Sequence, residues 1–162
     1  MTPTRIPVKA SEVRVGGADE VLFAIGLGSC VAIVLYDPQA KVGGLAHTML
    51  PTPASSRRPA PPGRFPETAL PVMLEEMTQR GAVLKRIYAR LVGGAAMFES
   101  ILADEGTPLG TRNVEASRAA LKAAGIPIRG EEVGANYGRT VHFHIADGRI
   151  LVTSVRRPDV VI

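Results

Sequence analysis

The sequence predicts mixed α/β layering around a largely antiparallel β-sheet or sandwich. Short β-branched segments lie on both sides of a helical middle section, with long returns between them. These segments do not alternate with helices as a doubly wound parallel sheet requires. With 162 residues, of which 46% are apolar and 21% charged, the chain has a globular composition and enough length for one core. We therefore expect a single domain over residues 1–162.

Four strands are predicted in the first 50 residues, where β-branched runs are separated by glycine pairs or by Asp-Pro. They are Glu12–Val15, Val21–Ile25, Val31–Tyr36 and Val42–Thr48. Residues 51–66 follow, with six of the thirteen prolines, so they predict a surface loop without helix or interior strand. A loop this long either lies beside a functional site or is simply tolerated.

The second half of the chain predicts helices and then strands. Leu70, Met73, Leu74 and Met77 recur at helical spacing and predict a helix over 67–79. A strand at Arg86–Val92 is expected next, then a small-residue turn at Gly93–Phe98 and a short helical piece from there to about Asp104. The last expected elements are a helix at about Asn113–Ala124 with Asn113 as its N-cap, and a closing β-meander of Ile128–Gly134, Arg139–Ile145 and Ile150–Val155.

The net charge of +4 does not indicate nucleic-acid binding, because three of the surplus charges, Arg57, Arg58 and Arg64, lie in the proline-rich loop. Aromatic residues make up only 4% of the chain, and basic residues do not interleave with them. The longest apolar runs are far shorter than the ~20 residues of a membrane-spanning helix, and the N-terminus lacks the apolar core of a secretory signal. We expect a cytoplasmic protein without membrane insertion.

The single cysteine, Cys30, is the leading candidate for chemistry. A buried cysteine more often packs as a small hydrophobe, and a nucleophilic thiol needs a base. If 31–36 and 42–48 are antiparallel neighbours, the start of the first strand faces the end of the second, which brings His47 to Cys30. The glycine turn at Gly28 and Ser29 would leave backbone N–H groups free to bind an oxyanion.

Other candidate sites carry less weight. His142 and His144 share one face of a predicted strand, but without further ligands they are better interpreted as surface histidines. Gly26-Leu-Gly28 lacks the third glycine of a dinucleotide-binding turn and precedes a strand where that motif requires a helix. We expect no metal and no cofactor.

Two segments, Gly26–Pro38 (GLGSCVAIVLYDP) and Gly43–Pro51 (GGLAHTMLP), closely resemble CheD, the chemoreceptor glutamine deamidase of bacterial chemotaxis. Gly93–Phe98, Gly110–Asn113 and Gly134–Arg139 resemble the later glycine-rich landmarks of that family. The resemblance implies a three-layered α/β fold similar to deamidases of the cytotoxic necrotizing factor type. It also implies Cys30 as nucleophile, His47 as base and the phosphatase CheC as a second partner.

The sequence departs from this family where a threonine often precedes the cysteine by six residues, because Ala24 stands there. We expect a backbone carbonyl near Ala24 to orient His47 instead. The expected function is hydrolysis of specific glutamine side-chain amides of methyl-accepting chemotaxis receptors, with Arg57, Arg58 and Arg64 attracting acidic receptor surface. The alternatives are a non-catalytic chemotaxis adaptor of the same fold and a cysteine hydrolase with another substrate.

Overall fold

The computed structural model describes residues 2–53, 59–97 and 106–162. The described residues form ten strands, two α-helices and two short 3-10 helices. The strands are β1 (Thr4–Pro7), β2 (Val13–Gly16), β3 (Glu20–Leu27), β4 (Val31–Asp37), β5 (Val42–Thr48), β6 (Tyr88–Gly93), β7 (Ile128–Val133), β8 (Arg139–His144), β9 (Arg149–Thr153) and β10 (Val160–Val161). The helices are η2 (Pro62–Arg64), α1 (Pro66–Gln79), η3 (Leu84–Arg86) and α2 (Leu109–Ala123).

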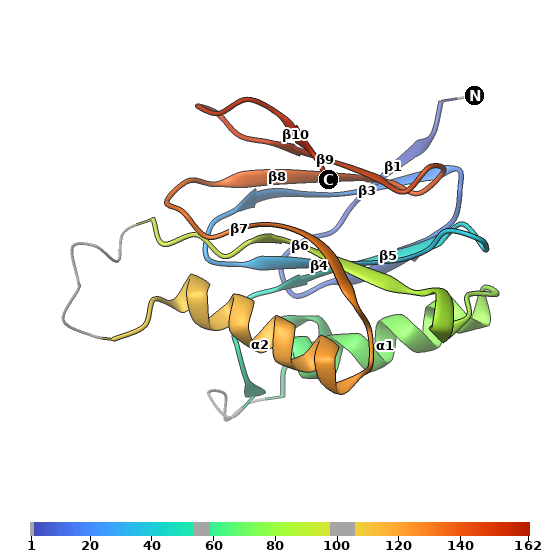
Figure 1. Cartoon of the computed structure of the whole chain (residues 1–162), viewed down its shortest axis with the longest axis horizontal. Helices are drawn as coiled ribbons and strands as arrows, with labels where there is room; N and C mark the ends of the chain where they lie inside the picture. The colour runs from blue at the N-terminus through green and yellow to red at the C-terminus, as the bar shows by residue number, and fades with distance from the viewer. Residues whose placement is uncertain (1, 54–58, 98–105) are drawn as a thin grey trace.

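The strands form two five-stranded sheets that pack face to face. Sheet A has the order β1-β3-β8-β9-β10, and sheet B has the order β2-β5-β4-β6-β7. The pairs β1–β3 and β6–β7 are parallel, and the other pairs are antiparallel. Helices α1 and α2 cover the face of sheet B that is turned away from sheet A (Figure 1). The prediction of mixed α/β layering on largely antiparallel strands is confirmed.

Strand β4 lies at the centre of sheet B, and all seven of its residues are buried. Ala32, Val34 and Tyr36 face sheet A, where they pack in the same core cluster as Phe143. The alternate residues pack toward the helices in a second cluster, which includes Met73. The strand is apolar throughout because both of its faces are covered, whereas a strand with one wet face would alternate.

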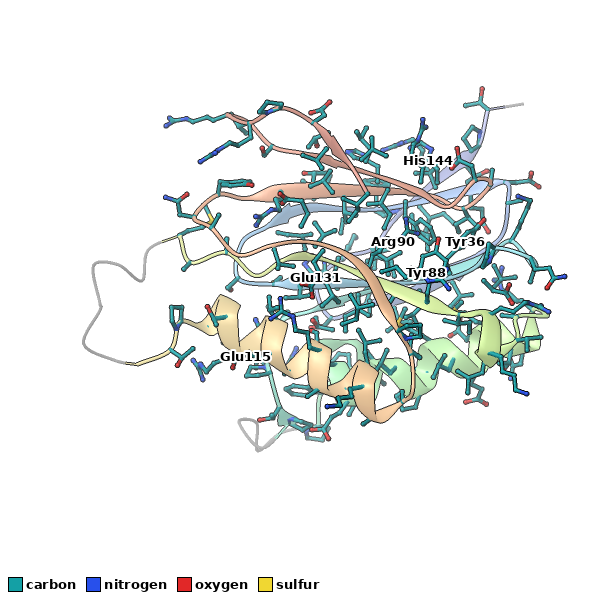
Figure 2. The ribbon with its side chains drawn as sticks, viewed as in Figure 1. Tyr36, Tyr88, Arg90, Glu115, Glu131 and His144 are labelled. Carbon is teal, nitrogen blue, oxygen red and sulfur yellow. The ribbon has the colours of Figure 1, made fainter. Side chains whose placement is uncertain are left out.

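An aromatic cluster closes the sandwich at the C-terminal end of β4. The Tyr36 ring packs edge-on against Tyr88 and Phe143, with centroids 6.1 and 5.6 Å away. The Arg90 guanidinium lies over the Tyr88 ring at 5.1 Å, and Figure 2 shows these side chains together between the sheets. Cys30 precedes the first residue of β4, so it lies at the opposite end of the sandwich.

The predicted C-terminal meander is wrong in its first strand. β7 does not pair with β8; it joins sheet B in parallel with β6, and α2 forms the crossover between them. Parallel neighbours need such a long crossover, whereas β8 and β9 form the predicted hairpin around Asp147-Gly148.

Helix α2 begins at Leu109, four residues before the predicted N-cap, so Asn113 lies within the helix and is fully buried. The short helical piece predicted between the turn at 93–98 and about Asp104 lies outside the described residues. The turn predicted before it agrees with residues 93–97, which are not helical. β1 and β10 were not predicted, because each is short and largely exposed.

The proline-rich segment 51–66 is not entirely a surface loop. Pro62–Arg64 forms a 3-10 turn, and Phe65 and Gly63 are buried. Proline is compatible with the first turn of a helix because the N–H that it lacks would have no partner there. A Cβ on Gly63 would lie 2.4 Å from the Ser11 carbonyl oxygen, which shows how closely this turn packs against the N-terminal segment.

In the described part of the chain, no helix combines the length and apolar character needed to cross a membrane.

Candidate active site

Cys30 lies where the chain crosses from sheet A to sheet B. β3 ends at Leu27 in sheet A and β4 begins at Val31 in sheet B, so residues 28–30 connect the two layers. The predicted turn at Gly26 is instead a bulge within β3, where the register with β8 shifts between Ala24 and Leu27. Gly26 has a φ of +67°, and Ile25 is 69% exposed. Bulges of this kind re-aim side chains beside active sites.

The predicted pairing of β4 with β5 is confirmed, and it places His47 on the same side of sheet B as Cys30. His47 lies opposite Ala32 in the antiparallel register. Cys30 is two residues before Ala32, so its side chain points to the same face. Both side chains line one pocket of about 480 Å³, without a hydrogen bond between them in the described structure. Catalytic contacts of this kind often tighten only when substrate binds.

The N-terminal segment holds His47 in one orientation. The imidazole Nδ1 lies 3.0 Å from the Val8 carbonyl oxygen, and this contact is buried. A carbonyl can only accept, so Nδ1 carries the proton and Nε2 of the neutral ring has the free lone pair. The His47 backbone is also held, because its N–H donates to Glu12 O and its carbonyl accepts the Ser11 N–H. Nε2 is therefore the nitrogen that could accept a proton.

The expected orienting carbonyl near Ala24 thus belongs to Val8, and the assignment to Ala24 itself is corrected. β1 and β3 are parallel with Pro7 opposite Phe23, so Val8 continues this register alongside Ala24. The Val8 N–H donates to Phe23 O at 2.8 Å, which fixes the position of the residue. Ala24 is 1% exposed and packs in the core between the sheets.

Burial raises the pKa of the Cys30 thiol, and the nearby N–H of the same residue offsets only part of this effect. No cationic group contributes to the shift. The resting thiol is therefore neutral near pH 7, and a base must remove its proton when it reacts.

The backbone before Cys30 is anchored through its carbonyl groups. The Gly28 carbonyl accepts the Ala95 N–H at 2.8 Å. The Ser29 carbonyl accepts Nδ2 of Asn113, also at 2.8 Å. The N–H groups on the same peptide units are those of Ser29 and Cys30, and neither donates to another residue in the described structure. The oxyanion site predicted at Gly28 and Ser29 stays a prediction, and these two N–H groups are its candidate donors.

Two glycines allow β6 to approach Cys30 closely. Gly93 has a φ of +113°, and a Cβ there would lie 2.3 Å from the Cys30 carbonyl oxygen. Gly94 has a φ of +67°, and its N–H donates to that same oxygen at 2.8 Å. Larger residues at these positions would displace the turn that carries the thiol.

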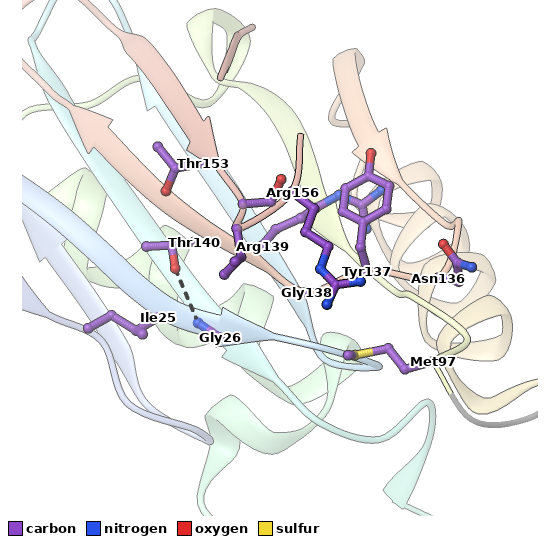
Figure 3. A pocket seen from close by; sticks show the side chains of 12 residues that line it. Ile25, Gly26, Met97, Asn136, Tyr137, Gly138, Arg139, Thr140, Thr153 and Arg156 are labelled. Atoms are coloured by element: carbon purple, nitrogen blue, oxygen red, sulfur yellow. Dashed lines mark hydrogen bonds between the residues drawn. The ribbon is translucent and has the colours of Figure 1, made fainter. Parts of the chain in front are cut away.

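A second, larger pocket of about 710 Å³ adjoins the first, because Ile25 and Gly26 line both (Figure 3). The Gly26 N–H lies 3.4 Å from Thr140 Oγ1 on its floor. Val155, which is fully exposed, and Arg156 contribute to its rim. No carboxylate is present among the described residues that line either pocket.

The remaining candidates do not line the pocket that contains the thiol, or they lie outside the described residues. Arg57 and Arg58 belong to the segment that the structure does not describe. Arg64 accepts the Met49 N–H through its carbonyl, and its Nε donates to Ser11 Oγ. His142 and His144 lie on the outer face of β8, and burial together with nearby arginines lowers the pKa of each.

Two residues that hold this site together were not predicted from the sequence. Val8 acts through its carbonyl, which leaves no signal in side-chain chemistry. Asn113 was predicted to cap the helix. Its position four residues before Ser117, on the same helix face as the apolar Val114 and Leu121, could have indicated a buried amide.

Comparison with known proteins identifies the family of the chain. The family model for CheD chemotactic sensory transduction matches residues 49–154. The chain belongs to the CheD family. A CheD relative from Caldanaerobacter subterraneus, named a probable chemoreceptor glutamine deamidase, is 45% identical over 88% of this chain and 93% of its own length. The chemoreceptor glutamine deamidase CheD of Thermotoga maritima is 43% identical over 83% of this chain and 82% of its own length.

Among solved structures, the Neisseria meningitidis protein NMB0706, which matches the family model DUF152, has a similar fold. The TM-score is 0.52 with 12% sequence identity over 83% of this CheD chain. The match spans 64% of the length of NMB0706, and at this level of identity it concerns the fold alone.

Proposed function

We propose that this CheD protein is a chemoreceptor glutamine deamidase that hydrolyses glutamine side-chain amides of methyl-accepting chemotaxis receptors to glutamate and ammonia. The observation that carries the proposal is the shared pocket of Cys30 and His47, in which Val8 fixes the tautomer of the histidine. Relatives named chemoreceptor glutamine deamidases, at 43–45% identity, support the same substrate class.

The reaction begins with the protonated thiol of Cys30 beside His47, whose Nδ1 is held by the Val8 carbonyl. His47 Nε2 takes the thiol proton as Cys30 Sγ bonds to the amide carbon of the substrate. The N–H groups of Cys30 and Ser29 are the nearest donors for the oxyanion that forms. His47 then returns the proton to the leaving nitrogen, the C–N bond breaks, and ammonia departs. Water, deprotonated by the same histidine, cleaves the thioester and releases glutamate and the free thiol.

The substrate glutamine enters the pocket that contains the thiol, and the neighbouring receptor residues extend across Ile25 into the larger pocket. The exposed Ile25 and Val155 offer apolar contacts to the receptor. Arg156 lines the larger pocket, where no carboxylate stands among the described lining residues, and this favours acidic receptor segments. Arg156→Glu therefore raises KM for receptor substrate and weakens its salt dependence, whereas an unchanged KM at low salt would contradict this placement.

Four further assignments are proposals. The arginines of the proline-rich segment, Arg57, Arg58 and Arg64, attract acidic receptor surface, and CheC competes with receptor for the same face of the protein. A competition binding assay with a receptor fragment and purified CheC tests the second assignment. The single domain over 1–162 and its kinship with cytotoxic necrotizing factor-type deamidases are also proposals, supported by the layered α/β fold.

The decisive experiment is peptide mass spectrometry of a receptor cytoplasmic fragment after incubation with wild-type protein, Cys30→Ser or His47→Gln. We expect particular glutamines to become glutamate, with release of ammonia, only in the wild-type sample. Receptor binding without any conversion would favour the non-catalytic adaptor. A Cys30-dependent conversion of a different amide or ester, with receptor glutamines intact, would favour a hydrolase with another substrate.

A further inference from the structure

The side chain of Asn113 connects helix α2 to both strands that carry the candidate catalytic pair. Asn113 is fully buried, and its Nδ2 donates to Ser29 O at 2.8 Å and to Met49 O at 3.0 Å. Ser29 immediately precedes the nucleophile, and Met49 follows the base by two residues. Because both partners are carbonyl oxygens, which only accept, the orientation of the amide is unambiguous.

The bond to Ser29 acts directly on the N–H of Cys30. The Ser29 carbonyl and the Cys30 N–H belong to one planar trans peptide unit, and they point in opposite directions. Holding the oxygen therefore also fixes the direction of the N–H. The adjacent unit is held in the same way, since the Gly28 carbonyl accepts the Ala95 N–H and the Ser29 N–H lies on its other side.

Stability alone does not account for asparagine at this position. Its Oδ1 is buried without a hydrogen-bond partner among the described residues. An unsatisfied buried acceptor costs about 1–3 kcal/mol, and asparagine is a poor residue for a helix interior. What the side chain provides in return is a donor group that holds two loop carbonyls at the active site.

We propose that Asn113 is a positioning residue of the deamidase, which aims the Cys30 N–H at the oxyanion formed during attack on the substrate amide. This inference rests on the proposed function, because it assumes that Cys30 attacks a carbonyl group. It assigns Asn113 no contact with the substrate. The side chain acts through the Ser29–Cys30 peptide unit.

The test compares two reactions of the same thiol. In deamidation the sulfur attacks a carbonyl carbon and an oxyanion forms. In alkylation by iodoacetamide the sulfur displaces iodide from a tetrahedral carbon, and no oxyanion forms. We expect Asn113→Leu to lower kcat for deamidation by about 10- to 100-fold, the range for a slightly misplaced group, with KM nearly unchanged. The alkylation rate of Cys30 should stay close to that of the wild type.

Thr48→Val is the matched control. Thr48 is also fully buried beside the site, and its hydroxyl donates to a backbone carbonyl, Val31 O, at 2.9 Å. That carbonyl shares its peptide unit with the Ala32 N–H, which lies within β4 and not at the thiol. The control should lose stability but keep kcat. If Asn113→Leu does not fold, Asn113→Ser removes the same amide with less steric demand and undergoes both assays.

The outcomes separate this inference from the proposed function. A selective loss of kcat in the Asn113 variants, with alkylation intact, supports the positioning role. Equal losses in both reactions, an unchanged kcat, or an equal loss of kcat in Thr48→Val would each overturn it and make Asn113 a purely structural residue. A wild-type protein whose Cys30 is alkylated normally but which deamidates no receptor glutamine would refute the proposed function, and this role with it.

Discussion

Replacing Gly93 with alanine should damage the active site through a single added carbon. The new Cβ would lie 2.3 Å from the Cys30 carbonyl oxygen, while real Cβ contacts are not shorter than 3.0 Å, so the two groups must separate by at least 0.7 Å. Gly93 also has a φ of +113°, which an alanine adopts at a cost of about 1–3 kcal/mol. A misplacement of about 1 Å can lower turnover by about 100-fold. We expect a loss of kcat/KM of this order.

Gly81→Ala provides a control with matched backbone strain. Its φ of +99° is similar, but a Cβ there meets no atom within 4 Å, and it lies beyond the C-terminus of α1. The assay is deamidation of a receptor fragment at a temperature well below the melting transition of both variants. Gly81→Ala should lose stability only. If Gly93→Ala retains as much activity as Gly81→Ala, the position of the Cys30 turn is not critical and the reasoning is refuted.

Three further predictions follow from the same structure. Burial raises the pKa of the Cys30 thiol, so without substrate the alkylation rate of Cys30 should rise with pH and reach half its maximum above the pKa of free cysteine, ~8.5. A fast rate that does not depend on pH near neutrality would instead indicate a stable thiolate. The buried Asp37 accepts bonds from Arg86 and three backbone N–H groups, which lower its pKa despite the opposing effect of burial, so Asp37→Ala should cost about 3 kcal/mol of unfolding free energy at pH 7. Because the pKa is lower in the folded state, urea titrations of wild type and variant should converge as pH falls below the unfolded value of ~3.9; a constant gap would exclude the carboxylate as the cause. Ala24→Thr should lower the melting temperature without raising kcat, since Ala24 is 1% exposed in the core and His47 already has a carbonyl partner; a large gain in kcat would show that this partner is insufficient.

The parts of the site that could be predicted are those set by short-range pairing. The hairpin from β4 to β5 needs only two apolar runs and a turn at Asp37-Pro38, and its antiparallel register brings the start of one strand to the end of the other. The approach of Cys30 and His47 follows from that register. The glycine at position 26 was recognised, but its place in a bulge depends on β8, which is more than 100 residues away along the chain.

The parts that could not be predicted depend on contacts between distant segments. Val8 reaches His47 only because β1 adds to sheet A in parallel, and Asn113 reaches Ser29 only because α2 crosses sheet B. The meander error has the same origin, although the order strand, helix, strand from 88 to 133 was available in the sequence and favours a parallel pair.

The histidine and the thiol differ in how far the fold prepares them for reaction. His47 is fixed before substrate arrives, since Val8 sets its tautomer and residues 11–12 hold its backbone. The backbone of Cys30 is held in place, but its thiol is not ionised in advance, because burial raises its pKa and no cationic group contributes to the shift. A buried thiolate would be open to alkylation and oxidation at all times. Because the raised pKa keeps Cys30 protonated between turnovers, proton transfer to His47 generates the nucleophile as the amide is attacked, which suits the proposed deamidase acting on single side chains of a large protein.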